Sequence, residues 1–296
     1  MTPIPITAFA LNSPDGARPT AYRSVPEGRP RAIVQIAHGM AEHFNRYRRL
    51  TRALTDAGYA VFGQDHRGHG ASAAVHGLGD FGPGGFQSVV DDMAGLSRTA
   101  REAFPGAPLI LLGHSMGSFA AQLYLLDHHE ELAGLILSGT ASVDALRAAV
   151  AAGEGAPSPD PLNAPFAPAR TPFDWLSRDE AEVDAYIADP LCGFALTDEA
   201  RRSVFATAAG APNDHRLELV NKTLPILVIS GEHDPVTGPG QAFAEAVISG
   251  YRAAGLNRIA HRVYPGGRHE MFNEINRQAV TRDLLAWLDG GAPAAG

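Results

Sequence analysis

Short apolar stretches alternate with longer stretches of helical periodicity along most of the chain. The apolar stretches have the length of buried strands, each running into a loop, and lie at 32–39, 59–70, 108–115, 134–140, 224–235 and 258–267. Helical spacing predicts helices at 46–59, 86–106, 116–129, 239–254 and 273–289. Strands that are apolar on both faces and alternate with helices predict a mostly parallel sheet covered by helices on both sides.

The first strands differ from this alternation. Two short stretches, 6–13 and 20–26, are joined through the turn residues Pro14, Asp15 and Gly16. We therefore expect them to form two strands connected by a turn at the start of the chain.

The alternation also stops over 141–223, where no strand is predicted. Six prolines lie in 157–172, and two helices follow. One is expected to begin at Ser177–Glu180, where a serine and a glutamate three residues apart form a capping box. The other is expected to begin at Thr197 and to end before Gly210. We expect the charged residues that open the first helix to lie on a solvated face.

This break divides the chain into a core and an insertion. The insertion is predicted to form a helical cap over the carboxyl-terminal edge of the sheet, where α/β proteins collect their functional loops. The predicted parts are an α/β core at 1–140 and 224–290, the cap at 141–223 and a disordered tail at 291–296.

Composition and charge narrow the class of protein. The formal net charge of −8 argues against a nucleic-acid-binding protein, which needs clustered lysine and arginine. Cys192 is the only cysteine, so no intramolecular disulfide can form. The first residues show neither a basic region nor a long apolar region, and no apolar run is long enough to span a bilayer. We expect a cytoplasmic protein.

The sequence Gly113-His114-Ser115-Met116-Gly117 lies between a predicted strand and a predicted helix. A Gly-x-Ser-x-Gly turn in this context is a nucleophile elbow, which projects the serine hydroxyl above the sheet. The flanking positions must be small because they pack closely in this turn. We therefore predict Ser115 as a nucleophile.

A serine nucleophile needs a base and an acid that orients the base. His269 is the candidate base because it follows the last predicted strand on a glycine-rich loop at the catalytic edge. Asp234 follows the preceding strand and is the candidate acid, with Glu232 as its rival. The order Ser115, Asp234, His269 is that of the α/β-hydrolases. Among the other histidines, His128 and His129 are expected to be solvated, and His66 and His69 to support their loop. His38 and His43 do not have the helical metal-binding spacing, and the turn is expected to direct the His114 side chain away from Ser115.

Backbone amides are the best donors to an oxyanion because they are already oriented, and one donor contributes about 2.7–4 kcal/mol. We predict the N–H of Met116, directly after the nucleophile, and the N–H of Met40, in the loop after the strand at 32–37. This chemistry is complete with side chains and amides, so we expect no cofactor and no catalytic metal.

A resemblance to the monoacylglycerol lipase and lysophospholipase branch of the α/β-hydrolases is carried by HGMAEHFNRY at 38–47, DHRGHGAS at 65–72, LLGHSMGS at 111–118, GEHDP at 231–235 and GGRHE at 266–270. The resemblance implies the same triad and the same two oxyanion donors. It also implies that the insertion, including DPLC at 189–192, is a cap over an apolar acyl pocket. Ser118 departs from the family, which often has glycine there.

The cap contains apolar and aromatic residues, most of which we expect to form its own small core and some to face the pocket: Phe166, Phe173, Trp175, Tyr186, Leu191, Phe194 and Phe205. Cys192 is expected to be a plain buried cysteine.

We predict a serine carboxylic-ester hydrolase that acts on a lipid-like acyl ester, with monoacylglycerol lipase as the first choice. A lysophospholipase and a small-ester carboxylesterase are the first alternatives within enzymes, and the same triad also serves proline-type peptidases and carbon–carbon bond hydrolases. A slow or non-catalytic ligand-binding sensor is the alternative from another class. A transient contact of the cap with a membrane surface is compatible with each of these, and the sequence leaves the oligomeric state open.

Overall fold

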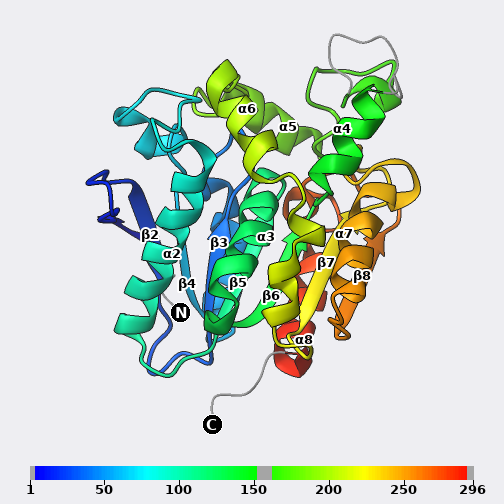
Figure 1. The fold of residues 1–296 in the computed structure, drawn as a ribbon. Coiled ribbons are helices and arrows are strands. Elements are labelled where there is room, and N and C mark those ends of the chain that lie inside the picture. The colour runs from blue at the N-terminus through cyan, green and yellow to red at the C-terminus, as the bar shows by residue number, and fades with distance from the viewer. Residues whose placement is uncertain (1–3, 152–161, 292–296) are drawn as a thin grey trace.

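A single eight-stranded sheet forms the centre of the computed structural model, which describes residues 4–151 and 162–291 (Figure 1). The strand order is β1-β2-β4-β3-β5-β6-β7-β8. β1 and β2 pair antiparallel, β2 pairs antiparallel with β4, and all the other pairs are parallel. The strands are β1 Thr7–Ala10, β2 Thr20–Ser24, β3 Ile33–Ala37, β4 Ala60–Gln64, β5 Leu109–His114, β6 Leu132–Ser138, β7 Ile226–Gly231 and β8 Ile259–Tyr264. The predicted mostly parallel α/β sheet is confirmed.

Helices surround this sheet and also lie above it in Figure 1. The α-helices are α1 Arg48–Asp56, α2 Gly85–Ala103, α3 Met116–His128, α4 Val143–Ala151, α5 Glu180–Ala188, α6 Asp198–Thr207, α7 Ala242–Ala253 and α8 Arg277–Gly291. Short 3-10 turns lie at Phe44–Tyr47, Gly70–Ala74, His129–Glu131, Ala164–Phe166, Ala211–Asn213, His215–Leu219, Pro239–Gln241 and Met271–Asn273. Among the described residues, no helix combines the length and the apolar character needed to cross a membrane.

Two apolar cores, one on each face, hold the sheet between its helices. Alternate residues of β5 enter different cores: Leu109 and Leu111 join one, and Ile110 and Leu112 join the other. The first core also takes residues from α2, α3 and α7, which lie in front of the sheet in Figure 1. The second takes residues from α1 and α8. This double burial explains why β3, β5, β6 and β7 are apolar at nearly every position, whereas the edge strand β8 is partly exposed and contains His261 and Arg262.

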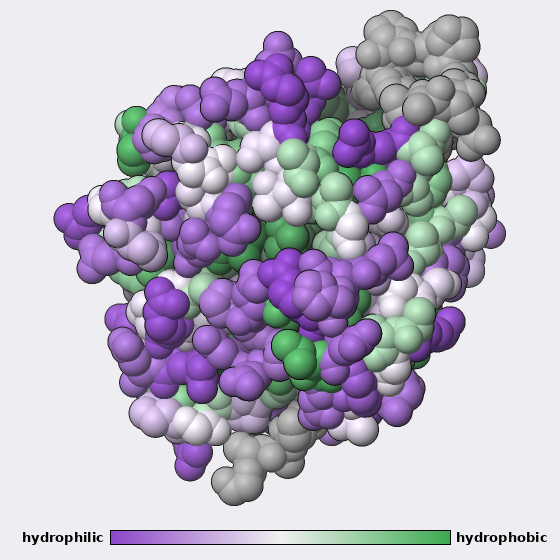
Figure 2. Space-filling model, viewed as in Figure 1, coloured by the Kyte–Doolittle hydropathy of each residue, from purple (hydrophilic) through white to green (hydrophobic). Residues whose placement is uncertain are grey.

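The surfaces of the helices that face away from the two cores are mainly polar. Figure 2 shows a mostly hydrophilic face, with paler hydrophobic patches along its right side over α4 and α7. The apolar content of the chain is thus buried mainly between sheet and helices.

The last predicted helix begins later than expected. The periodicity indicates a helix over 273–289, but α8 begins at Arg277 and extends to Gly291. A 3-10 turn forms at Met271–Asn273, and Glu274 is extended, with ψ at 165°. This local break separates the turn from the helix. Gly291, placed in the predicted tail, belongs to α8, and the rest of that tail lies outside the described residues.

The described part of the stretch between β6 and β7 contains helices and turns but no strand, and its helices α4, α5 and α6 lie at the top of the molecule (Figure 1). Hydrogen bonds fasten it to core loops. The Gly193 N–H and the Tyr186 hydroxyl both donate to the Ala41 carbonyl, at 3.0 and 2.9 Å. The Thr197 N–H donates to the Gly79 carbonyl at 3.0 Å. We propose the whole of 141–223 as the cap.

The predicted capping box at the start of α5 was wrong. The N-cap is Asp179, whose carboxylate accepts from the Ala181 N–H at 3.2 Å. Ser177 instead donates its hydroxyl to the Asn273 carbonyl at 3.0 Å, in the loop before α8. Asp179, which lies nearer the helix, satisfies the free amide, because the serine is held by a tertiary contact.

The charges at this end of α5 are also only partly solvated. Arg178 pairs with the buried Glu274 at 3.0 Å, and Asp179 pairs with Arg277 at 2.7 Å. Both pairs join the cap to the segment that precedes and opens α8. Glu180 and Asp184 remain exposed, as the sequence indicates.

Candidate active site

Ser115 lies at the turn between β5 and α3 in a backbone conformation that few side chains adopt. Its φ is 52° and its ψ is −122°. Strain of this kind costs about 1–3 kcal/mol and persists where the surroundings impose it. The Ser115 N–H donates to the Ser138 carbonyl at the end of β6, at 2.9 Å. This hydrogen bond therefore holds the turn to β6 at Ser115 itself.

The glycines on both sides of Ser115 let the backbone approach more closely than any side chain permits. A Cβ placed on Gly113 lies 2.7 Å from the Ser118 Cα. A Cβ placed on Gly117 lies 2.6 Å from the Ala37 carbonyl carbon in β3. The predicted reason for two small residues in this turn is confirmed, and α3 can pack against β3 only because of Gly117.

Ser118, the departure from the family pattern, also supports the turn. Its hydroxyl donates to the Ser115 carbonyl at 2.6 Å. The oxygen also lies 2.8 Å from the Thr140 hydroxyl, after β6. The substitution therefore keeps the elbow geometry and adds a polar contact behind it.

His269 and Asp234 come together in the loops after β8 and β7. The His269 Nδ1 lies 2.9 Å from Asp234 Oδ1 and 3.0 Å from Oδ2, and both side chains are buried. Glu232, the rival acid, is exposed and accepts from the Gly266 N–H at 2.7 Å. The structure thus brings Asp234, and not Glu232, to the imidazole.

The surroundings of His269 favour its charged form. Burial opposes charge on the ring, but the charge of Asp234, its hydrogen bond and the nearby charges of Glu270 and Glu42 together raise the pKa of His269 above its ordinary value. An imidazole held in this way is stabilised when it takes up a proton.

The ring of His269 is positioned from several sides. Its centroid lies 4.6 Å from that of His114 and 4.9 Å from that of Trp175 in the cap. Gly139 also borders this ring, because a Cβ placed on Gly139 would lie 2.7 Å from His269 Cε1.

Among the described residues no hydrogen bond joins Ser115 to His269, and the Nε2 atom of His269 has no hydrogen-bond partner. Catalytic hydrogen bonds are often long without substrate and shorten when it binds.

The two predicted oxyanion donors are both amides without an acceptor in the described part of the chain. Met116 is the first residue of α3, where the amide has no partner within the helix, and its side chain is buried. Met40 lies in the loop after β3, with a side chain that is 36% exposed. Gly39, directly before it, donates its N–H to Glu42 Oε1 at 2.5 Å. This loop is therefore fixed beside the amide of Met40.

A buried charged network behind this loop escaped the sequence analysis. Glu42 also accepts from the Tyr47 hydroxyl at 2.7 Å, and Arg46 lies 3.5 Å from Glu42 and 2.5 Å from Glu270. Burial, and then the charge of Glu270, raise the pKa of Glu42 to about 7. The sequence did contain an indication of this network, since Glu42 lies inside the HGMAEH motif and Glu270 inside the GGRHE motif.

The other histidines near the site line the core loops. The His38 ring lies 4.1 Å from that of His66 and 5.3 Å from that of His69, and burial lowers the pKa of all three. The His66 N–H donates to His38 Nε2 at 2.9 Å. These contacts fit the predicted role of His66 and His69 as loop supports.

The model of the family described as serine aminopeptidase, S33, matches residues 28–276, which include all these loops. The chain belongs to this α/β-hydrolase family. A monoacylglycerol lipase from Mycolicibacterium smegmatis is 32% identical over 275 residues, covering 89% of this chain and 90% of the relative. The human monoglyceride lipase is 27% identical over 276 residues, covering 88% of this chain and 86% of the relative.

Solved structures agree on the fold. A thermostable carboxyl esterase from Bacillus coagulans, solved in complex with glycerol, superposes with a TM-score of 0.83 at 28% identity, covering 97% of this chain and 98% of that one. A monoglyceride lipase from Saccharomyces cerevisiae, in complex with a substrate analogue, superposes with a TM-score of 0.75 at 21% identity, covering 99% and 97%. The monoacylglycerol lipase-like branch that the motifs resemble is confirmed.

Replacement of Gly117 tests the close approach of α3 to β3. We expect Gly117→Ala to lower the free energy of unfolding by about 1–3 kcal/mol, because the added methyl meets backbone that cannot move aside. Gly95→Ala in α2 is the control: the nearest atom is on the flexible Arg98, 3.7 Å away, and alanine favours a helix by about 1 kcal/mol. Denaturant unfolding measures both, and equal midpoints for Gly117→Ala and the wild type would contradict this account.

The pH profile tests the role of Asp234. With His269 as base, kcat/KM should rise with pH through an apparent pKa above the ordinary imidazole value of about 6.5, because the protonated ring cannot accept the serine proton. Asp234→Asn should lower kcat about ten-thousand-fold. It should also shift the rise of kcat/KM to lower pH, since the carboxylate that stabilises the protonated His269 ring is lost. Glu232→Gln is the matched control and should keep rate and profile. If kcat/KM of Asp234→Asn rises at the same pH as that of the wild type, Asp234 does not act on His269 as described.

Proposed function

We propose that the protein is a serine carboxylic-ester hydrolase of the monoacylglycerol lipase type. The observation that carries this proposal is the buried Asp234–His269 pair at the same sheet edge as the strained Ser115. In the proposal, Ser115 is the nucleophile, His269 the base and Asp234 the acid, and the amides of Met40 and Met116 hold the oxyanion.

The reaction proceeds through an acyl-enzyme in two halves. His269 Nε2 takes the Ser115 proton while the serine oxygen attacks the ester carbonyl, and Asp234 stabilises the imidazolium through Nδ1. The negative charge moves to the carbonyl oxygen, which the two amides stabilise. His269 then protonates the departing alcohol. Water repeats the same steps on the acyl-enzyme and releases the acid.

The substrate class rests on the relatives and on the cap. The names of the relatives describe monoacylglycerol lipases, a phospholipase from Bacillus subtilis and carboxyl esterases. Trp175 of the cap packs on His269, so an apolar residue of the cap lies beside the reacting groups. A monoacylglycerol is the first substrate proposed, and a lysophospholipid or a small ester is the alternative. A slow ligand-binding sensor with the same residues is the alternative without sustained turnover.

An ester series tests this function. We expect hydrolysis of p-nitrophenyl esters from acetyl to palmitoyl to favour medium or long chains, and a monoacylglycerol to release glycerol. Ser115→Ala should lower kcat by about 10⁶-fold, as loss of the nucleophile does in a Ser-His-Asp enzyme. Ser249→Ala, at an exposed serine on α7, is the matched control and should leave turnover unchanged.

Each other result points to a different function. Activity confined to short chains supports the small-ester alternative, and turnover of a lysophospholipid in preference to a monoacylglycerol supports the phospholipase. A single burst of product without sustained turnover supports the sensor. Equal activity of Ser115→Ala and the wild type would refute the serine mechanism.

A further inference from the structure

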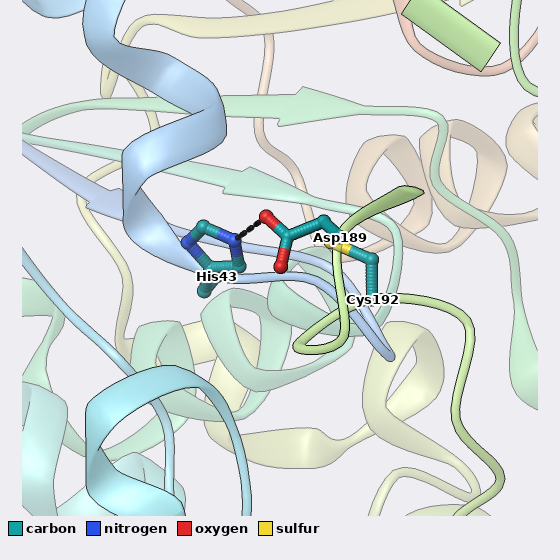
Figure 3. Close-up of side chains that lie close together, drawn as sticks. All are labelled: His43, Asp189 and Cys192. Atoms are coloured by element: carbon teal, nitrogen blue, oxygen red, sulfur yellow. Dashed lines mark hydrogen bonds and ion pairs between the residues drawn. The ribbon is translucent and has the colours of Figure 1, made fainter. Parts of the chain in front are cut away.

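Three potential metal ligands meet where the cap contacts the loop after β3. His43 comes from the core loop, and Asp189 and Cys192 come from the turn after α5 (Figure 3). Their ligand atoms all lie within 4.8 Å of one another, and no other group of this kind occurs in 4–151 and 162–291. We propose that His43, Asp189 and Cys192 bind one divalent transition-metal ion, with Zn²⁺ as the best match. This site goes beyond the proposed function and does not depend on it.

The ligand chemistry selects the class of metal. An imidazole nitrogen, a thiolate and a carboxylate suit Zn²⁺ and its borderline neighbours, whereas Mg²⁺ and Ca²⁺ prefer oxygen alone. Zinc bonds of about 2.0–2.3 Å place tetrahedral ligands about 3.3–3.8 Å apart. The widest gap here must close by about 1 Å, and the 2.9 Å contact between His43 Nε2 and Asp189 Oδ2 must open slightly. The fourth position would belong to water.

The backbone already presents these ligands from fixed segments. The Cys192 N–H donates to the Asp189 carbonyl at 3.0 Å, so the two cap ligands share one turn. Asp189 Oδ1 accepts from the Leu191 N–H at 2.9 Å, which leaves Oδ2 facing His43. The bonds to the Ala41 carbonyl hold this turn against the core loop two residues before His43. Ion binding therefore replaces the hydrogen bond between His43 and Asp189 with metal–ligand bonds, and it requires little additional ordering of the chain.

The charges around the site admit a cation. Arg46 is the nearby positive group, but it is buried against Glu42 and Glu270 and is already matched by them. Burial raises the pKa of Cys192 to about 12; the charge of Arg46 lowers it, and those of Asp189, Glu42 and Glu270 add to the rise. The thiol is therefore protonated at neutral pH. Metal binding must displace that proton to solvent, one for each ion bound.

A bound ion would link the cap to the loop that carries the Met40 amide. His43 is three residues after Met40, and Asp189 and Cys192 follow α5 directly. An ion that binds the folded protein across this contact stabilises the folded state by mass action. The spacing of the three residues in the chain gives no metal motif, because 146 positions separate His43 from Asp189.

Cobalt titration of the untagged full chain tests the site. Co²⁺ bound to a thiolate gives a charge-transfer band in the near ultraviolet, and we expect this band to saturate at one equivalent and to disappear when Zn²⁺ is added. Cys192→Ser should abolish it. His43→Gln and Asp189→Asn should each weaken Co²⁺ binding at least about tenfold. His261→Gln is the matched control, because His261 lies 2.8 Å from Glu245 with no cysteine beside it.

Thermal unfolding gives a second readout that does not use a spectrum. Zn²⁺ should raise the melting temperature of the wild type and of His261→Gln, and should leave Cys192→Ser unchanged. The proposal is overturned if the wild type shows no thiolate band. It is equally overturned if His43→Gln and Asp189→Asn both keep full affinity, or if Zn²⁺ stabilises Cys192→Ser as much as the wild type.

Discussion

The close approach of α3 to the sheet at Gly117 is the constraint on which the rest of the site depends. This contact sets the position of the helix start, and the helix start fixes the sharp turn at Ser115. The strain of that turn is offset by packing on both sides, by the bond to Ser138 and by the Ser118 hydroxyl. The same contact leaves the Met116 amide at the first position of α3, where no carbonyl of the helix can reach it. The close packing at Gly117 thus positions both the proposed nucleophile, Ser115, and a proposed oxyanion donor, the Met116 amide.

Buried charge is the second organising feature. Asp234, Glu42 and Glu270 all lie inside the molecule near His269, with Arg46 between the two glutamates. Burying such groups is costly unless each is paired and hydrogen-bonded, and here each carboxylate has a partner. The field of these carboxylates favours the protonated imidazole. The network that fixes the loop of Gly39 also contributes to the basicity of His269, so geometry and electrostatics are coupled here.

The cap joins this arrangement through a few specific contacts. Trp175 packs on the His269 ring, and the Trp175 carbonyl lies 3.3 Å from the His269 amide nitrogen, which donates to it. On the other side of the site, Ala41 accepts two hydrogen bonds from the cap. The cap therefore contacts both the loop of His269, the proposed base, and the loop of the Met40 amide. A change in the cap thus acts directly on these two loops and does not have to pass through the core.

The sequence alone determined the fold class and brought Ser115, Asp234 and His269 forward, because strand and helix periodicity are local and the Gly-x-Ser-x-Gly turn is contiguous. It also explained the two glycines correctly, since their role follows from that turn. The sequence also favoured Asp234 over Glu232, but only the tertiary structure showed that the Asp234 carboxylate contacts the His269 ring while Glu232 binds the Gly266 amide. The tertiary structure alone showed Ser177 held by Asn273 in place of a helix cap, the network of Glu42, Arg46 and Glu270, and the meeting of His43 with Cys192. These contacts join residues that are distant in the chain, and no local spacing encodes a distance of that kind.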